Sequence, residues 1–197
     1  LMENKQIYVD TFFARQPIFS ARKTVWGYEL LYRGSPDDTY ASFDDNDIAT
    51  LTVISNAIMN MPSGKDTGRK VLIHFTKGSI KREIPLALPP ETTVVEVEEN
   101  FGQDPEMVEA LKKLKAQKYD IAVNNFSSKT SCLPLYKLAD IVFIDLLGKD
   151  RETVKGLVDK AQELPFMLAA KRVEELQQFE MANDLGIMNC IECGSCA

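Results

Sequence analysis

Three cysteines near the carboxyl end of the chain, Cys190, Cys193 and Cys196, have the spacing C-x2-C-x2-C. Thiolates at this spacing open the ferredoxin-type motif C-x2-C-x2-C-x3-C-P, which holds an iron–sulfur cluster. The sequence ends one residue after the third cysteine, so it does not contain the last cysteine and the proline of that motif. A structural zinc site normally takes four ligands from the protein, and the remaining cysteine, Cys132, is distant in sequence. We therefore expect a tail beyond the folded domain, with metal binding by this run as the alternative.

Polar side chains also recur where successive short apolar runs end. These residues are Glu29, Arg33, His74, Glu96, Glu98, Glu99, Asn124, Asn125, Asp145, Lys171 and Arg172. Carboxylate and amide oxygens bind hard divalent cations, whereas Arg and Lys bind anions such as phosphate. If the runs are neighbouring parallel strands, these side chains meet at one end of the sheet and form a candidate site. The alternative interpretation is a set of ordinary solvated strand ends.

The elements that would position these residues follow from the apolar pattern. Short apolar runs predict strands at 11–19, 25–33, 71–75, 93–97, 120–126, 140–147 and 166–170. Amphipathic spacing predicts helices at 45–61, 105–118, 151–163 and 173–185. Alternation of almost continuously apolar strands with helices predicts an α/β fold, and seven candidate strands favour a barrel close to (β/α)8. A doubly wound open sheet is the alternative, which is disfavoured because no glycine-rich nucleotide-binding loop follows a strand.

Composition limits the classes of function. The 197 residues contain 23 Lys and Arg against 29 Asp and Glu, and this net charge of -6 disfavours a nucleic-acid-binding surface. No apolar run approaches the roughly 20 residues that span a bilayer, and no basic-then-apolar leader opens the sequence. Four cysteines are too few for a disulfide scaffold in a chain of this length. We expect one cytoplasmic domain without a nucleic-acid or membrane partner.

Several ordered motifs between about residues 12 and 186 resemble the EAL domain, the fold of cyclic di-GMP phosphodiesterases. They are A-R-Q-P-I-F at 14–19, G-Y-E-L-L-Y-R at 27–33, V-E-V-E-E at 95–99, V-F-I-D at 142–145 and A-K-R-V-E at 170–174. The form is similar to that of bacterial EAL–HDOD signalling proteins, in which an HDOD domain normally follows. The resemblance implies an EAL-like TIM-type (β/α) barrel at 11–186, after an N-terminal extension at 1–10 and before a cysteine-containing tail at 187–197.

The resemblance also implies an eighth strand with a Q-G motif, after the helix that ends at Leu185 and Gly186. Neither the motif nor its glutamine follows Gly186 in this sequence. We therefore expect a barrel that is incomplete at the eighth strand. The alternative is that the tail, through Ile187 and Met188, pairs like a strand in that position.

Active EAL enzymes hold two divalent cations, Mg²⁺ or Mn²⁺, with carboxylates and an asparagine, and these metals activate water. At the matching positions, Glu29 and Glu96 keep the ligand type that the family uses. His74 replaces the asparagine, and Asn124 and Asn125 replace the paired aspartates of the D-D-F-G motif. The resemblance therefore implies loss of the carboxylate pair that bridges the two metals.

Two further departures change charge. Phe143 stands where the family has the lysine of K-I-D, which orients the attacking water, and Lys171 stands where it has the glutamate of A-E-G. A lysine close to a would-be metal site repels the cation. We therefore expect a catalytically inactive EAL-like module of bacterial signal transduction, without a cofactor. The alternative is a weakly active phosphodiesterase that uses Mg²⁺ or Mn²⁺, with His74 as a metal ligand.

Such a module would act through a protein partner or a homodimer, for which the helix at 45–61 is a candidate interface, and by binding cyclic di-GMP. The ligand-binding residues that the resemblance implies are Gln16, Glu29, Arg33, His74, Glu96, Asn124, Asn125, Asp145, Lys171 and Glu174. Arg33 would pair with a phosphate and Lys171 would replace a metal as its counter-charge. The competing interpretation, which we favour, is that Arg33 and Lys171 neutralise Glu29 and Glu96 and so stabilise the barrel mouth.

Overall fold

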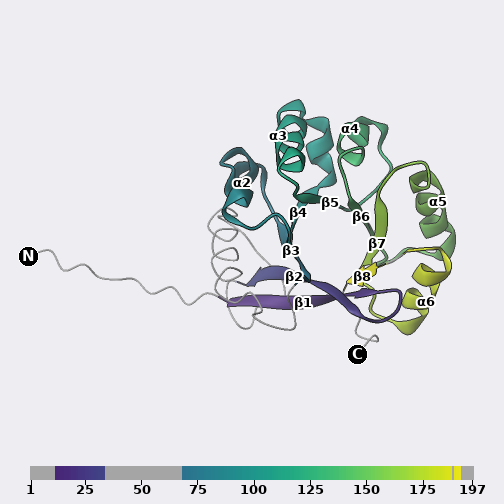
Figure 1. Ribbon diagram of the computed structural model, residues 1–197. Coiled ribbons are helices and arrows are strands. Elements are labelled where there is room, and N and C mark those ends of the chain that lie inside the picture. The colour runs from purple at the N-terminus through teal and green to yellow at the C-terminus, as the bar shows by residue number, and fades with distance from the viewer. Residues whose placement is uncertain (1–11, 34–67, 188, 192–197) are drawn as a thin grey trace, which may run out of the picture.

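A computed structural model describes residues 12–33, 68–187 and 189–191 of the chain. Within these ranges, eight strands form one closed barrel in sequence order, and helices α2–α6 lie around its outside (Figure 1). The strands are β1 (Phe12–Ser20), β2 (Val25–Arg33), β3 (Lys70–His74), β4 (Thr93–Glu98), β5 (Asp120–Asn124), β6 (Ile141–Asp145), β7 (Met167–Lys171) and β8 (Asn189–Ile191). The helices are α2 (Lys77–Lys81), α3 (Pro105–Ala116), α4 (Leu133–Tyr136), α5 (Arg151–Ala161) and α6 (Leu176–Asp184), with 3-10 turns η1 (Ile84–Ala87), η2 (Glu99–Gln103) and η3 (Thr130–Cys132).

The barrel contains one reversed strand. β1 runs antiparallel to both of its neighbours, β2 and β8, whereas all other neighbouring pairs are parallel. The strands β2 to β8 therefore end at the same mouth of the barrel. At the other end of β2, Gly27 allows β3 to approach, because a Cβ atom there would lie 2.5 Å from the carbonyl oxygen of Lys70.

The prediction of an α/β barrel is confirmed, and the open doubly wound alternative is wrong because the sheet closes on itself. The eighth position is filled only over a short length. β8 has three residues, which pair with Ile18–Ser20 of β1 and with Ala169–Ala170 of β7. The expectation of a barrel that is incomplete at the eighth strand is confirmed, since β8 is the shortest strand described and pairs with only part of each neighbouring edge. Strand-like pairing of the tail, the alternative, is present over the same short length, because residues 189–191 of the expected tail belong to the sheet and satisfy backbone groups on both edges.

The seven predicted strands are present with ends shifted by one or two residues in most cases. The predicted helix at 45–61 lies outside the described residues. The short helices α2 and α4 and the 3-10 turns were not predicted, because elements of three to five residues are too short to show helical periodicity. No helix in the described ranges has the length and apolar character needed to cross a bilayer.

Side chains alternate between the two faces of each strand, so the apolar residues form two layers. The same alternation decides on which side of the barrel the polar residues lie. The inner layer fills the barrel with aliphatic side chains and one aromatic ring, from Ile18, Leu72, Val94, Ala122, Ile141, Phe143 and Ala169. Side chains of the intervening positions face the helices, which explains why the strands read as continuously apolar. Two residues beyond inner-layer positions come His74, Glu96, Asn124, Asp145 and Lys171. Because side chains alternate with a period of two, these five residues lie on the inner side, at the mouth.

Candidate functional site

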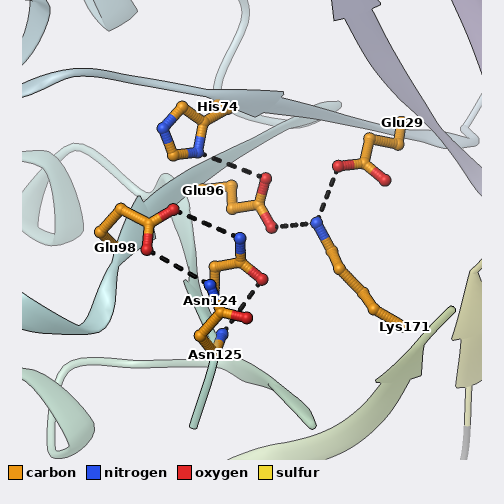
Figure 2. A network of polar contacts seen from close by, with 7 residues as sticks. All are labelled: Glu29, His74, Glu96, Glu98, Asn124, Asn125 and Lys171. Atoms are coloured by element: carbon orange, nitrogen blue, oxygen red, sulfur yellow. Dashed lines mark hydrogen bonds and ion pairs between the residues drawn. The ribbon is translucent and has the colours of Figure 1, made fainter. Parts of the chain in front are cut away.

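The side chain of Lys171 lies between two buried carboxylates at the mouth (Figure 2). Its Nζ donates hydrogen bonds to Glu29 Oε1 at 2.8 Å and to Glu96 Oε1 at 2.5 Å. The side chains of Lys171, Glu29 and Glu96 are 14%, 6% and 1% exposed. Nζ also lies 4.9 Å from the ring centroid of Phe143, within the range of a cation–π contact. One lysine on β7 thus ties β2 and β4 together across the barrel.

The opposite charges of Lys171 and Glu96 favour the ionised form of each residue. Burial alone would raise the pKa of Glu96, but the ammonium of Lys171 and the contact with His74 outweigh it and lower that pKa to about 2. Burial alone would lower the pKa of Lys171, yet Glu96 and Glu29 raise it above its ordinary value. At neutral pH, Lys171 is therefore a cation and Glu96 an anion, and the lysine supplies the positive charge at this point of the mouth.

His74 lies beside Glu96 in the register of β3 and β4. Its Nδ1 is 3.6 Å from Glu96 Oε2, the carboxylate oxygen that Lys171 does not contact in the bonds above. Burial disfavours the charged imidazole and Lys171 opposes it as well, but Glu96 and Glu98 outweigh both, so the pKa of His74 is raised. His74 is therefore a second cationic partner for Glu96 as the pH falls.

Glu98 is held by two amides. Asn124 Nδ2 donates to Glu98 Oε1 at 3.3 Å, and Asn125 Nδ2 donates to Glu98 Oε2 at 3.4 Å (Figure 2). The backbone N–H of Asn125, which has a left-handed φ of 57°, donates to Asn124 Oδ1 at 3.0 Å. Both amides therefore act as donors to an anion. Aspartates in their place would put three carboxylates together, an arrangement that needs added cations.

Asp145, at the end of β6, forms a separate ion pair. Its Oδ1 accepts hydrogen bonds from Arg172 Nε at 2.8 Å and from the backbone N–H of Leu147 at 2.9 Å, and Arg172 Nη2 contacts Oδ2. Arg172 has a φ of 57°, a left-handed conformation that side-chain-bearing residues adopt at some cost. Both oxygens of the Asp145 carboxylate therefore contact the guanidinium of Arg172, which follows the neighbouring strand β7.

Three predicted residues remain, Gln16, Arg33 and Glu174, and none of the contacts described above includes them. Gln16 pairs with Glu29 across β1 and β2, and within the described ranges its Oε1 is buried without a hydrogen bond. Arg33 ends β2 opposite Phe12, and its side chain lies outside the described part of the structure. Glu174 lies beyond β7 as an exposed residue, and its backbone N–H donates to Gln178 Oε1 at 2.8 Å.

The cysteine run is only partly described. Cys190 is the middle residue of β8, whereas Cys193 and Cys196 lie outside the described residues. Among the residues that the structure describes, no three His, Cys, Asp or Glu side chains are arranged to hold a metal ion. Metal binding by Cys190, Cys193 and Cys196 stays a prediction.

Comparisons with known proteins point to one family of folds. No family model matches the chain. The cyclic di-GMP phosphodiesterase CdgJ of Vibrio cholerae is 30% identical over 193 residues, which cover 93% of this chain and 44% of that protein. The uncharacterized protein YuxH of Bacillus subtilis is 28% identical over 177 residues, which cover 87% of this chain and 43% of YuxH. The chain therefore spans less than half the length of these two relatives.

Solved structures match the fold over 92% of this chain. The S helix-GGDEF-EAL part of Vibrio cholerae LapD superposes with a TM-score of 0.75 at 17% identity, over 92% of this chain and 52% of that one. The FimX EAL domain superposes with a TM-score of 0.72 at 19% identity, over 92% of this chain and 87% of that domain. The chain has an EAL-type fold. The Bacillus subtilis YkuI protein, an EAL structure solved with cyclic di-GMP and calcium, matches this EAL-type barrel with a TM-score of 0.71 at 20% identity, over 92% of this chain and 54% of YkuI.

One further polar residue of this EAL-type barrel, Glu99, was placed at a strand end but not among the predicted ligands. It is 6% exposed at the start of η2, and its carboxylate accepts hydrogen bonds from the Ser127 backbone N–H and Oγ, both at 2.6 Å, and from the hydroxyl of Tyr136. Burial would raise the pKa of Glu99, but Ser127 and Tyr136 lower it. Glu99 therefore anchors the loop that carries Asn125. The available signal was an acidic residue at one strand end followed, in the next strand–loop unit, by V-N-N-F-S-S, whose serines can donate hydrogen bonds. The sequence alone could not show that Glu99 accepts from Ser127.

We expect Glu99→Gln to lower the free energy of unfolding by about 2 kcal/mol, because hydrogen bonds to a buried charged acceptor are worth roughly 1.5–3 kcal/mol. Urea unfolding at neutral pH measures the effect. Lys129→Met is the matched control, since Lys129 is 58% exposed and its contact with Glu99 is 3.4 Å, and an exposed partner contributes at most about 1 kcal/mol. Equal, small losses in both variants would contradict the anchoring role.

Proposed function

We propose that this chain is an EAL-type signalling module whose barrel mouth does not hydrolyse phosphodiesters with two metal ions, and which acts by binding. The observation that carries the proposal is the position of Lys171, whose ammonium bonds Glu29 and Glu96 at 2.8 and 2.5 Å. These are the two glutamates that keep the ligand type of active EAL enzymes. An internal cation therefore occupies the place between them.

The residues at the mouth do not fit a pair of divalent cations. A metal ion between Glu29 and Glu96 would have to displace Lys171, and these carboxylates raise the pKa of Lys171 and so favour its charged form. The amides of Asn124 and Asn125 are used as donors to Glu98 and bring no formal charge to balance a second metal ion. Hard cations prefer a dense shell of charged oxygens. We derive no catalytic step through a metal at this mouth.

The proposed ligand is cyclic di-GMP, the molecule bound in the EAL structures of LapD and YkuI. Gln16 supports a ligand with hydrogen-bond donors, because its buried Oε1 has no partner among the residues that the structure describes. An unsatisfied buried acceptor costs roughly 1–3 kcal/mol, which a donor from the ligand would recover. Lys171 and Arg172 are already paired with carboxylates. We therefore expect binding to depend on polar contacts with the bases more than on these two cations.

A weakly active phosphodiesterase is the second candidate, and the observation in its favour is the 30% identity to an enzyme named a cyclic di-GMP phosphodiesterase. Both candidates place the chain in bacterial second-messenger signalling. Cytoplasmic location, an attached HDOD domain and a protein partner belong to the same proposal, and they rest on the resemblance of the motifs.

Two measurements on one preparation of the protein distinguish the two candidate functions. We expect no hydrolysis of cyclic di-GMP with excess Mg²⁺ or Mn²⁺, measured by chromatography of the products, together with heat of binding in a calorimetric titration without metal. Gln16→Ala serves as the control variant, and we expect its affinity for cyclic di-GMP to be lower than that of the parent chain. Metal-dependent turnover would establish the second candidate. Absence of both heat and turnover would leave the mouth as a structural ion-pair cluster and refute the binding proposal.

A further inference from the structure

Glu98 is the last residue of β4, and its carboxylate lies at the barrel mouth beside Asn124 and Asn125 (Figure 2). It is not among the ligand-binding residues that the resemblance implies. Asn124 Nδ2 donates to one of its oxygens at 3.3 Å, and Asn125 Nδ2 donates to the other at 3.4 Å. The two amides therefore fix the orientation of this carboxylate at the mouth.

Glu98 differs in its partners from the other carboxylates of the mouth. Lys171 donates hydrogen bonds to two of them, Glu29 and Glu96. A third, Asp145, forms an ion pair with an arginine. Within the described ranges, Glu98 forms no ion pair with a lysine or an arginine, and it is only partly buried. Its carboxylate is therefore accessible to a ligand.

The carboxylate of Glu98 has acceptor capacity to spare. An ionised carboxylate has about four lone-pair sites, two on each oxygen. The amides of Asn124 and Asn125 use one site on each oxygen, and no other described residue donates to Glu98. One acceptor site on each oxygen is left. Such a carboxylate can accept two parallel hydrogen bonds from a planar group with two adjacent donors.

Guanine is a planar group of this kind. Its Watson–Crick edge carries two adjacent donors, the ring N1–H and the exocyclic N2–H₂, which point in the same direction. Adenine has one donor and one acceptor on that edge, and hypoxanthine lacks the exocyclic amine. A carboxylate therefore discriminates guanine from both of these bases, because either of them leaves one carboxylate oxygen without its donor.

We propose that Glu98 recognises guanine in the ligand of this mouth, by accepting hydrogen bonds from N1–H and N2–H₂ of one base. The inference rests on the proposed binding of cyclic di-GMP and names the contact that makes this binding specific. The phosphates of the ligand are anionic and are repelled by Glu98, so a neutral base edge faces it.

The second guanine of the ligand also finds an acceptor at the mouth. Gln16 lies on β1, three strands away from β4 in the barrel, and its buried Oε1 lacks a donor within the described ranges. A donor of the second base satisfies that atom. Two separate acceptors, on Gln16 and Glu98, thus suit a ligand that has two identical donor edges.

Ligand analogues test the contact without any change to the protein. In calorimetric titration of the parent chain without metal, we expect roughly ten- to hundredfold higher affinity for cyclic di-GMP than for cyclic di-IMP, in which hypoxanthine replaces guanine. Cyclic di-AMP should bind no more tightly than cyclic di-IMP. Equal affinities for cyclic di-GMP and cyclic di-IMP would overturn the role of Glu98 and leave the proposed function standing. Absence of heat with all three ligands would refute the proposed function, and this inference with it.

Glu98→Gln separates recognition of the base from support of the neighbouring loop. The variant keeps the shape of the side chain but replaces one acceptor by a donor. We expect the affinity for cyclic di-GMP to fall roughly ten- to hundredfold and that for cyclic di-IMP by about threefold or less. Equal losses for both ligands would show that Glu98 only orients Asn124 and Asn125, and would overturn the proposal.

Glu109→Gln is the matched control for the loss of one negative charge. Glu109 lies on α3, and its side chain is 66% exposed. We expect its substitution to leave the affinities for both ligands within about twofold of the parent values, since solvent screens an exposed charge. A loss of preference in Glu109→Gln as large as that in Glu98→Gln would assign the effect to overall charge and overturn the proposal.

Discussion

Lys171→Met lowers the free energy of unfolding by about 3–5 kcal/mol, because it leaves two buried carboxylates without their cation. The side chains concerned are 1% to 14% exposed, so water cannot take over the role of the ammonium. Methionine keeps most of the volume of lysine, which separates the loss of charge from the loss of packing. Urea unfolding at pH 7, followed by circular dichroism, measures the change.

Two controls accompany this substitution. Lys155→Met removes a pair with Asp159 whose side chains are 59% and 50% exposed, and we expect a loss of no more than about 0.5 kcal/mol. The variant Lys171→Met, Glu29→Gln, Glu96→Gln removes the whole buried charge group, and it should recover much of the stability that Lys171→Met loses. Added Mn²⁺ should stabilise Lys171→Met more than the parent chain, since only the variant lacks the ammonium that lies between Glu29 and Glu96. A loss in Lys171→Met no larger than in Lys155→Met would contradict the proposed role of Lys171.

Acid should destabilise the protein through Glu96. Its pKa lies at about 2 in the folded chain against an ordinary value of 4.5, a difference that corresponds to about 3 kcal/mol. A carboxyl group with a lowered pKa contributes stability above its ordinary pKa, and the contribution is lost as the pH falls through the folded value. We expect it to be complete above about pH 5 and to disappear between about pH 4.5 and pH 2.

The pH profile of the difference between the parent chain and Glu96→Gln isolates this contribution. We expect the difference in unfolding free energy to be largest near neutral pH and to vanish near pH 2. With Lys171→Met as background, the main cause of the lowered pKa is removed, and the same difference should disappear at a higher pH. A difference that stays constant from pH 7 to pH 2 would show that Glu96 has an ordinary pKa in the folded chain.

Much of the fold could be predicted because the signals are local. The apolar runs and the helical spacing of residues 105–118 and 151–163 depend only on side chains that are near one another in sequence. The short elements α2 and α4 and the three-residue strand β8 could not be predicted in this way. β8 forms because β1 and β7 leave two edges to be paired, a condition that exists only once the barrel has curved round.

The candidate site, like the fold, could be predicted from local signals only in part. The sequence by itself determined which groups stand at the strand ends, because a strand has a period of two and its last inner residue precedes a loop. It therefore placed His74, Glu96, Asn124, Asp145 and Lys171 at one level, whereas Glu29 lies four residues before the end of β2. Only the tertiary structure decided that Lys171 lies between Glu29 and Glu96, residues 142 and 75 positions away, and that Glu99 holds the loop of Asn125. Closure of the barrel sets these distances, and the sign and burial of the partners then set the charge that each side chain carries.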